Sequence, residues 1–210
     1  MSNVSTLHIS ANQIAGFEKS SPAPLFQSLS LIIQRVTEAH DQLATDHLVR
    51  RVYGWRGYRV KQQTGNPHDL DRVTLAAWQD GNLAGTLTLS RDNERGLLCE
   101  SLYPNEVSAL RAKGLKICEC SRLAIDPEFS SRKLLESFFR TAYDFARSHF
   151  GATDALIEVN PRHCRYYESE LGFSRLGPRR LCPRVQAPAL LLHHDFKNSL
   201  PTNRVSRLAA

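Results

Sequence analysis

Strand-like and helix-like periodicities alternate along this chain, and a hairpin interrupts the alternation in its first half. The hairpin signal, Asp80-Gly81-Asn82, lies between two apolar runs and predicts two antiparallel neighbours. An inserted hairpin predicts a mixed α/β (α+β) sheet with helices packed on it, and it excludes a doubly wound parallel sheet. The patterns predict strands at residues 29–37, 73–79, 83–90, 115–125, 155–159, 174–182 and 189–194, and helices at residues 38–53, 105–113, 132–150 and 162–171.

The length of 210 residues fits one domain with tails. Polar composition at the two ends predicts a flexible N-terminal arm at 1–27 and a disordered tail at 196–210, which leaves a domain at 28–195. No run approaches the roughly 18 apolar residues that span a bilayer, and the N-terminus has no apolar signal region. The five cysteines are scattered, which excludes a disulfide scaffold. We expect a reduced, cytoplasmic protein.

The net charge of +6 suggests an acidic partner, although ordinary solubility charge explains it as well. Nucleic acid, anionic lipid, a phosphate-bearing cofactor and an acidic carrier protein all qualify. The basic run around Arg179, Arg180 and Arg184 has no interleaved aromatic residues, so we expect no nucleic-acid partner. The cysteine and histidine spacings match no common metal site, so we expect no metal.

A first candidate site is Glu119-Cys120-Ser121-Arg122, near the end of a predicted strand. Strand alternation would place Glu119 and Ser121 on one face and Cys120 and Arg122 on the other. A carboxylate on a central apolar strand costs free energy unless it is paired or used. Two interpretations are equally open: a structural ion pair between Glu119 and an arginine, or a general base poised by partial burial.

A second candidate is the strand-to-helix junction that begins at Asn160 and Arg162. Polar groups at such junctions often face a cleft. His163, Tyr166 or Tyr167 could donate a proton to a leaving group there, although each taken alone is more commonly a core or capping residue. A third candidate is the start of the long helix, where Ser131, Arg132 and Lys133 could hold a phosphate or form a solvated cap.

These segments, in this order, resemble the long-chain N-acyl amino acid synthases. That family belongs to the GNAT-like acyltransferases and is close in fold to the acyl-homoserine-lactone autoinducer synthases. The resemblance spans roughly residues 28–195. It implies a mostly antiparallel sheet with a splayed central parallel strand pair and helices on both faces. It rests on Gly85-Thr86-Leu87, Gly96-Leu97-Leu98, Leu110-Arg111, Glu119-Cys120-Ser121-Arg122-Leu123-Ala124, and Asn160-Pro161-Arg162-His163 to Leu171-Gly172-Phe173.

The resemblance implies transfer of a long-chain acyl group from an acyl carrier protein thioester to the amine of an amino acid. No cofactor would be permanently bound, and the acyl-phosphopantetheine thioester would be a co-substrate. Acetyl-CoA enzymes of this fold usually carry glycines before the long helix, but residues 129–133 contain none, which favours carrier protein over CoA. Acidic carrier proteins also suit the net charge. The expected carrier-binding residues are Ser131, Arg132, Lys133 and Arg140.

The resemblance also suggests roles within one site, to which Ser121 and Asn160 belong. Glu119 would accept the amine's proton, and a backbone N–H near Leu123 or Ala124 would stabilise the oxyanion. Either Arg122 or Arg162 would hold the acceptor's carboxylate, and Tyr166, Tyr167 or His163 would protonate the departing thiolate.

Two alternatives stay open. One is an acetyl-CoA-dependent N-acetyltransferase of a small amine on the same fold. The other is a non-catalytic GNAT-like module that binds acyl thioesters or nucleic acid through its basic face. For the acyl transfer that the resemblance implies, the expected partners are an acyl carrier protein and an amino acid. Peripheral contact with a membrane during product release is compatible with this scheme.

Overall fold

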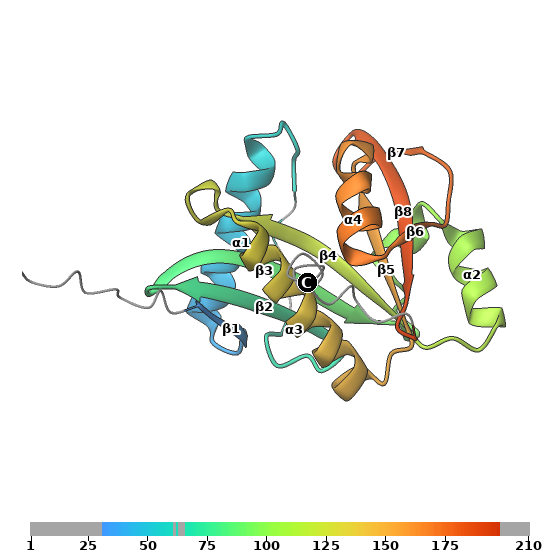
Figure 1. The fold of residues 1–210 in the computed structure, drawn as a ribbon, viewed down its shortest axis with the longest axis horizontal. Coiled ribbons are helices and arrows are strands. Elements are labelled where there is room, and N and C mark those ends of the chain that lie inside the picture. The colour runs from blue at the N-terminus through green and yellow to red at the C-terminus, as the bar shows by residue number, and fades with distance from the viewer. Residues whose placement is uncertain (1–30, 61, 63–65, 198–210) are drawn as a thin grey trace, which may run out of the picture.

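A computed structural model describes residues 31–60, 62 and 66–197 of the chain. The predicted N-terminal arm and nearly all of the predicted tail lie outside these residues. Strands and helices follow the order that the sequence predicts except at residues 174–182 (Figure 1). The strands are β1 (Leu31–Arg35), β2 (Arg72–Gln79), β3 (Asn82–Arg91), β4 (Ile117–Ile125), β5 (Asp154–Val159), β6 (Ser174–Arg175), β7 (Arg180–Cys182) and β8 (Ala187–Asp195). The helices are α1 (Ala39–Gly54), α2 (Pro104–Ala112), α3 (Arg132–Phe150) and α4 (Cys164–Leu171), with 3-10 turns η1 (Leu98–Ser101), η2 (Pro127–Phe129) and η3 (Pro161–His163).

The strands form one mixed sheet in the order β1-β2-β3-β4-β5-β8-β6, with β7 paired to β8. Every pair is antiparallel except β4 with β5, which is parallel. The predicted mixed, mostly antiparallel sheet with a central parallel pair is therefore confirmed. No helix in the described part of the chain is long and apolar enough to cross a membrane.

Local sequence signals explain why several elements begin and end where they do. Asp80 and Gly81 both have positive φ, 50° and 79°, as the type I′ turn of a two-residue hairpin requires. The hydroxyl of Ser131 accepts a hydrogen bond from the backbone N–H of Leu134 and caps α3, and Gly151 ends that helix in the left-handed conformation. The bounds predicted for the long helix, residues 132–150, are those observed.

The prediction of a single strand at residues 174–182 is wrong. The segment forms the two short strands β6 and β7, separated by Gly177 and Pro178. Proline has no backbone N–H to donate to a sheet, so the ladder breaks there. The sequence patterns also did not predict η1, which becomes important below.

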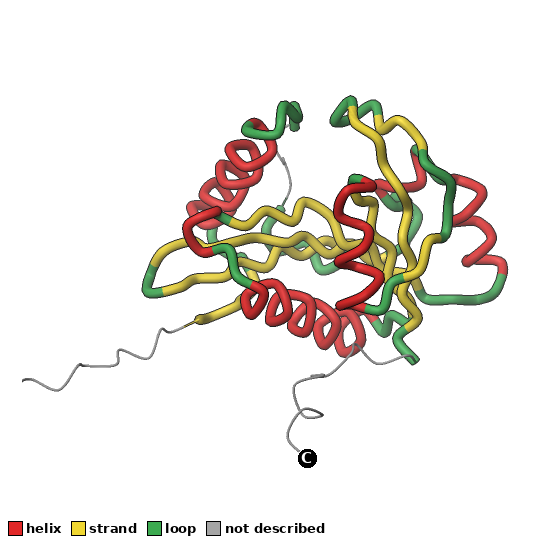
Figure 2. Tube along the Cα trace, turned by 45° about the horizontal axis from the view of Figure 1, so that its top comes forward, coloured by secondary structure: helices red, strands yellow, loops and turns green. Residues whose placement is uncertain are grey.

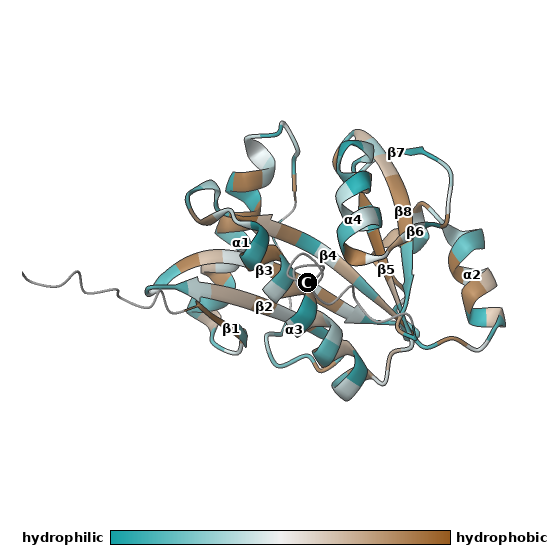
Figure 3. Cartoon of the chain, viewed as in Figure 1, coloured by the Kyte–Doolittle hydropathy of each residue, from teal (hydrophilic) through white to brown (hydrophobic). Residues whose placement is uncertain are grey.

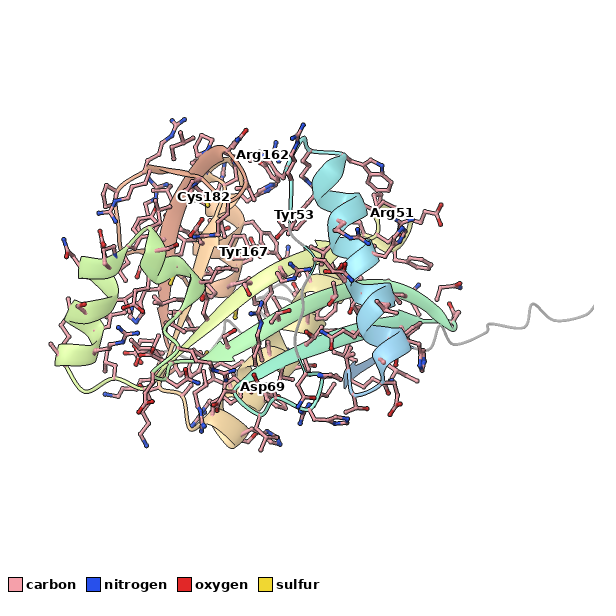
Figure 4. The ribbon with its side chains drawn as sticks, turned by 180° about the vertical axis from the view of Figure 1, so that it is seen from behind. Arg51, Tyr53, Asp69, Arg162, Tyr167 and Cys182 are labelled. Atoms are coloured by element: carbon pink, nitrogen blue, oxygen red, sulfur yellow. The ribbon has the colours of Figure 1, made fainter. Side chains whose placement is uncertain are left out.

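Helices cover both faces of the sheet. On one face, in front in Figure 1, α3 and α4 bury residues such as Phe138, Phe139 and Tyr167 against β3, β4, β5 and β8. On the opposite face, in front in Figure 4, α1 packs on β3 and β4, while α2 packs on β5 and β8. Figure 3 shows hydrophobic colouring along the central strands and a largely hydrophilic outward side on α3. The apolar stripe of α3 therefore faces the sheet, as its helical periodicity predicts.

Candidate active site

The two parallel strands separate partway along their length. β4 and β5 pair only from Ile117 opposite Asp154 to Cys120 opposite Ile157, although β4 continues to residue 125 and β5 to residue 159. Figure 2 shows the two halves of the sheet diverging beyond this point. The predicted splay of the central parallel pair is thus present. The ends of β4 and β5 leave their edges unpaired with each other, and we refer to this region as the opening.

A β-bulge in β4 lies at the opening. Thr88 pairs with Ser121 and Thr86 pairs with Ala124, so Leu87 faces two residues, Arg122 and Leu123. A bulge interrupts the ladder and re-aims the side chains around it. Arg122 has φ of 54°. The register of the bulge therefore places one extra residue of β4 at the point where the strands separate.

The bulge overturns the prediction that Arg122 faces away from Glu119. The guanidinium of Arg122 forms a buried ion pair with Asp46 of α1 at 2.6 Å, on the face that α1 covers. Glu119 pairs across the ladder with Ser90, which lies on that same face as Thr88. Strict alternation failed because the extra residue shifts the pattern by one position. Arg122 and Glu119 consequently share a face.

Glu119 is almost completely buried, with 1% of its surface exposed. Its two carboxylate oxygens accept hydrogen bonds from the backbone N–H groups of Leu98 (2.6 Å) and Cys99 (2.9 Å), at the start of η1. Burial raises the pKa of Glu119 to about 7, while the two backbone donors act in the opposite direction. Among the described residues, the ion pair with an arginine is therefore absent at Glu119: the carboxylate binds η1, and burial raises its pKa towards neutral pH, which leaves the interpretation as a buried general base open.

A second carboxylate lies on this face beside the opening. Glu158, near the end of β5, forms an ion pair with Arg184. Arg184 also donates hydrogen bonds to the carbonyl oxygen of Leu98 and the hydroxyl of Ser101. The basic run predicted around Arg180 and Arg184 is therefore engaged within the protein, since Arg180 is paired with Glu106.

The segment that follows α1 meets the segment that follows β5. The hydroxyl of Tyr58 accepts hydrogen bonds from the Asn160 side-chain amide (3.1 Å) and from Arg162 (3.3 Å). Tyr53, in the last turn of α1, is close enough to Arg122 and Glu158 for both to influence its pKa, which burial raises. Figure 4 shows Tyr53 and Tyr167 extending from α1 and α4 towards the same region, with Arg162 above them.

The three proton-donor candidates are not equivalent in the structure. Burial and the neighbouring Arg162 lower the pKa of His163, and its Nε2 accepts a hydrogen bond from Arg162 at 3.0 Å, so this ring is neutral near pH 7. The pKa of Tyr166 is raised by burial and by acidic residues that include Glu136 of α3. Tyr167 is buried between α4 and the sheet, close to Tyr53 and Cys120, and burial raises its pKa.

The remaining predicted residues belong to β4 and to α3. Ser121 and Leu123 are half-buried at the bulge, and Ala124 is buried against α1. At the start of α3, Ser131 is the helix cap and Arg132 is paired with Glu136 and Glu170. In the described part of the chain, no ion pair involves Lys133 or Arg140, and both are exposed.

Two small cavities lie on opposite faces of the sheet. An apolar cavity of about 20 Å³ lies under α3, beside the paired part of β4 and β5, and a polar one of about 10 Å³ lies under α1, beside the bulge. The apolar cavity is lined by Leu89, Cys118, Cys120, Phe139, Ala142, Tyr143, Ala155, Phe173, His194 and Phe196. The polar cavity is lined by Gln42, Thr45, Asp46, Val49, Thr74, Thr86, Thr88 and Arg122. Cys120 and Arg122, two residues apart on β4, thus line different cavities.

Sequence reasoning missed Asp46, Tyr53 and Tyr58. Asp46 and Tyr53 are seven residues apart and therefore share a face of α1 with the buried Val49, which is a signal that could have been used. Tyr58 lies in a loop with no periodicity, and only the fold brings it to Asn160. Across residues 31–60, 62 and 66–197, no group of three or more His, Cys, Asp or Glu side chains could hold a metal ion.

Comparison with solved structures agrees with this architecture. FeeM, an N-acyl amino acid synthase from uncultured soil microbes, matches with a TM-score of 0.73 at 22% identity, over 81% of this chain and 93% of that one. An N-acetyltransferase from Staphylococcus aureus matches with a TM-score of 0.57 at 14% identity, over 80% and 99%. The acyl-homoserine-lactone synthase LasI matches with a TM-score of 0.53 at 16% identity, over 80% and 89%. These likenesses establish a GNAT-like acyltransferase fold.

No curated protein sequence matches the chain. The family model described as N-acyl amino acid synthase FeeM matches residues 44–195, which run from within α1 to the end of β8 and include the opening. The match covers well over half of the 210 residues. The chain therefore belongs to the FeeM family of N-acyl amino acid synthases, which are N-acyltransferases.

Proposed function

We propose that this enzyme transfers a long-chain fatty acyl group from an acyl carrier protein to the amine of a free amino acid. The observation that carries the proposal is the pair of cavities on opposite faces of the sheet: an apolar cavity beside the paired part of β4 and β5, and a polar cavity beside the bulge, where the two strands separate. An acyl thioester whose carbonyl carbon lies in the opening would bury its apolar chain in the apolar cavity. Its carbonyl carbon would face an acceptor bound in the polar cavity.

The polar cavity suits the acceptor. A free amino acid carries a carboxylate and an ammonium group, and the buried Arg122–Asp46 pair presents the two complementary charges in one place. The rest of its lining includes the hydroxyls of Thr74, Thr86 and Thr88. Arginine can contact a carboxylate through two parallel hydrogen bonds. We assign Arg122 to the acceptor's carboxylate and Asp46 to its ammonium group.

The apolar cavity suits the acyl chain. Its walls come from α3, β3, β4, β5 and β8, and aromatic rings of Phe139, Tyr143 and Phe173 close it. The cavity holds only about 20 Å³ of free space, so a long chain requires these rings to rotate. The apolar area buried by each added methylene favours such a rearrangement.

The chemistry at the opening is an acyl transfer. The amine nitrogen forms a bond to the thioester carbonyl carbon, and the carbon–sulfur bond then breaks. A backbone N–H at the bulge around Leu123 stabilises the oxyanion, and the phenol of Tyr167 donates its hydrogen bond to the departing sulfur. Holding both substrates at the opening supplies much of the rate.

Glu119 is the proposed destination of the amine's proton. Its pKa of about 7 matches what a base needs at neutral pH. Because only 1% of its surface is exposed, the proton reaches it through a water molecule rather than by direct contact. Its hydrogen bonds to η1 hold it in place for this role.

The carrier protein is expected to dock beside the opening. The basic rim, defined here as Arg56, Arg59 and Arg162, is exposed, and no ion pair joins it to an acidic side chain in the described residues. Arg56 and Arg162 both influence the pKa of His163, so the two guanidinium groups are close together. Positive charge at this rim complements an acidic carrier protein and a phosphopantetheine phosphodiester. Lys133 and Arg140 of α3 would extend the contact.

A donor competition tests the proposal. The purified protein is given a mixture of amino acids with an acyl carrier protein thioester, the acyl-CoA of the same chain, or acetyl-CoA, and products are identified by mass spectrometry. We expect N-acyl amino acids, formed fastest from the carrier protein. Charge reversal with Arg162→Glu should raise the KM for the acyl carrier protein far more than that for acyl-pantetheine, which lacks the carrier surface.

Three results would contradict parts of the proposal. Products formed only from acetyl-CoA would favour the small-amine N-acetyltransferase alternative. A larger effect of Arg140→Glu than of Arg162→Glu would move the carrier contact from the basic rim to α3. Absence of any product, with the protein folded and binding thioester, would favour the non-catalytic alternative.

A further inference from the structure

One histidine side chain lines the apolar cavity under α3. Its lining holds aliphatic, aromatic and cysteine side chains together with a single histidine, His194 of β8. The residue is 2% exposed and is surrounded by the rings of Tyr143, Phe173 and Phe196, with centroid distances of 6.5, 5.2 and 5.8 Å. Its Nε2 is buried and has no hydrogen-bond partner within the described part of the chain.

The other ring nitrogen fixes the tautomer. Nδ1 of His194 lies 3.1 Å from the backbone carbonyl oxygen of Gly172. A carbonyl oxygen only accepts hydrogen bonds, so Nδ1 carries the hydrogen. Burial lowers the pKa of His194, which keeps the ring neutral. Nε2 therefore carries a lone pair and can only accept a hydrogen bond.

The register of the sheet places His194 on the paired side of the opening, not at the opening itself. His194 pairs with Ala155, which in turn pairs with Cys118, and the three side chains line the cavity side by side. The last paired residues before the strands separate, Cys120 and Ile157, are two positions further along each strand. A chain that enters at the opening and runs along β4 would bring its distal part, not its carbonyl end, to Nε2.

The hydrogen-bonding capacity of Nε2 restricts which chemical group the distal part of the chain can carry. A saturated chain would leave Nε2 buried without a partner, which is unfavourable. A keto group offers only lone pairs, which Nε2 would repel. A hydroxyl group on the chain donates the hydrogen bond that Nε2 accepts.

We propose that the cavity selects a fatty acyl chain that carries a hydroxyl group in its distal part, and that His194 Nε2 is the acceptor of that hydroxyl. This inference rests on the proposed acyl-transfer function and specifies its donor substrate. His194 is then a specificity-determining residue. It does not touch the reacting atoms.

Matched thioesters test the inference on the full chain. The saturated acyl thioester is compared with thioesters of equal length that carry a hydroxyl or a keto group at a distal carbon. We expect kcat/KM to be higher for the hydroxylated chain by roughly tenfold, the ratio that corresponds to one buried hydrogen bond. The keto chain should be transferred less well than the saturated one.

Variants assign the preference to one atom. His194→Phe keeps a ring of similar shape without the acceptor and should bring the ratio for hydroxylated and saturated chains close to one. His194→Gln, whose Oε1 reaches the position of Nε2, should retain part of the preference. The matched control is His193→Asn, which changes the neighbouring histidine on the opposite face of β8, where it binds Asp154, and should leave the ratio unchanged.

Nitrogen-15 spectroscopy of the wild-type protein tests the inference even if His194→Phe does not fold. In wild-type protein labelled with nitrogen-15 histidine, a free distally hydroxylated fatty acid should shift the Nε2 signal of His194, and the saturated acid should not. Equal kcat/KM for the two chains in the wild-type protein, or a preference that survives His194→Phe, would overturn the inference. If no chain is transferred, the proposed function fails, and the nitrogen-15 shift alone then decides whether the cavity binds a hydroxylated chain.

Discussion

Replacing Glu119 with glutamine changes the stability of the protein in a way that depends on pH. In the wild-type protein both carboxylate oxygens accept backbone hydrogen bonds from η1. In glutamine an NH₂ group stands in place of one carboxylate oxygen. One of the two backbone N–H groups then faces a donor and loses its hydrogen bond. Leaving a buried donor unsatisfied costs about 1–3 kcal/mol. Glu119→Gln should therefore be less stable than wild type by this amount when Glu119 is protonated.

The titration of Glu119 makes the free energy of unfolding of the wild-type protein depend on pH, and this opposes the deficit of Glu119→Gln at higher pH. Its pKa is raised from 4.5 to about 7 on folding, so the folded state holds the proton more tightly than the unfolded chain. The stabilisation is complete below pH 4.5 and is lost as the pH rises through 7. Between about pH 5 and pH 8 the wild-type protein loses roughly 2–3 kcal/mol through this group, at 1.36 kcal/mol per pKa unit. Glutamine does not titrate, so the deficit of Glu119→Gln should shrink or reverse at the higher pH.

Urea unfolding at the two pH values measures both contributions. The matched control is Glu136→Gln, the same change at an exposed ion pair, which should alter the free energy of unfolding by less than about 1 kcal/mol at either pH. A deficit of Glu119→Gln that is equal at both pH values would refute the raised pKa. Unchanged stability at the lower pH would refute the role of Glu119 in holding η1.

Three further predictions concern other parts of the structure. Tyr167→Phe should lower kcat roughly 100-fold, and the loss should be smaller for thioesters of more acidic thiols, which need less help to leave. Asp46→Asn removes the charge paired with Arg122 in a buried site, and should lower the free energy of unfolding by about 3 kcal/mol in urea titrations. Gly85→Ala adds a Cβ that would lie 2.6 and 2.8 Å from two side-chain carbons, so a thermal scan should show destabilisation of about 1–3 kcal/mol.

Elements with strong local signals were predictable from the sequence. The long helix α3 has a serine cap, one apolar stripe and a terminal glycine, and these three features fix both of its ends. The β2–β3 hairpin was equally clear because Asp80-Gly81 is the turn that such a hairpin requires. Asn160 and Arg162 were proposed as site residues because they lie at a strand-to-helix junction, and the structure places both beside Tyr58.

The parts that escaped prediction depend on contacts between distant segments. A positive φ at an arginine has no local signal, and the side chain of Arg122 is held by Asp46, 76 residues earlier in the chain. The two partners of Glu119 are backbone groups about 20 residues away, in a short turn that has no periodicity. Sequence patterns predict which face of a helix or strand is buried and where the element ends. They do not predict which elements pack against each other.

Mass spectrometry of lipid extracts tests the central claim most directly. A bacterial host that expresses this chain is compared with the empty host and with a host that expresses Tyr167→Phe. The account predicts new N-acyl amino acids in the first extract, little in the third and none in the second, and the fragment masses reveal both acyl chain and acceptor. An extract identical to that of the empty host, with folded protein present in the cells, would contradict it.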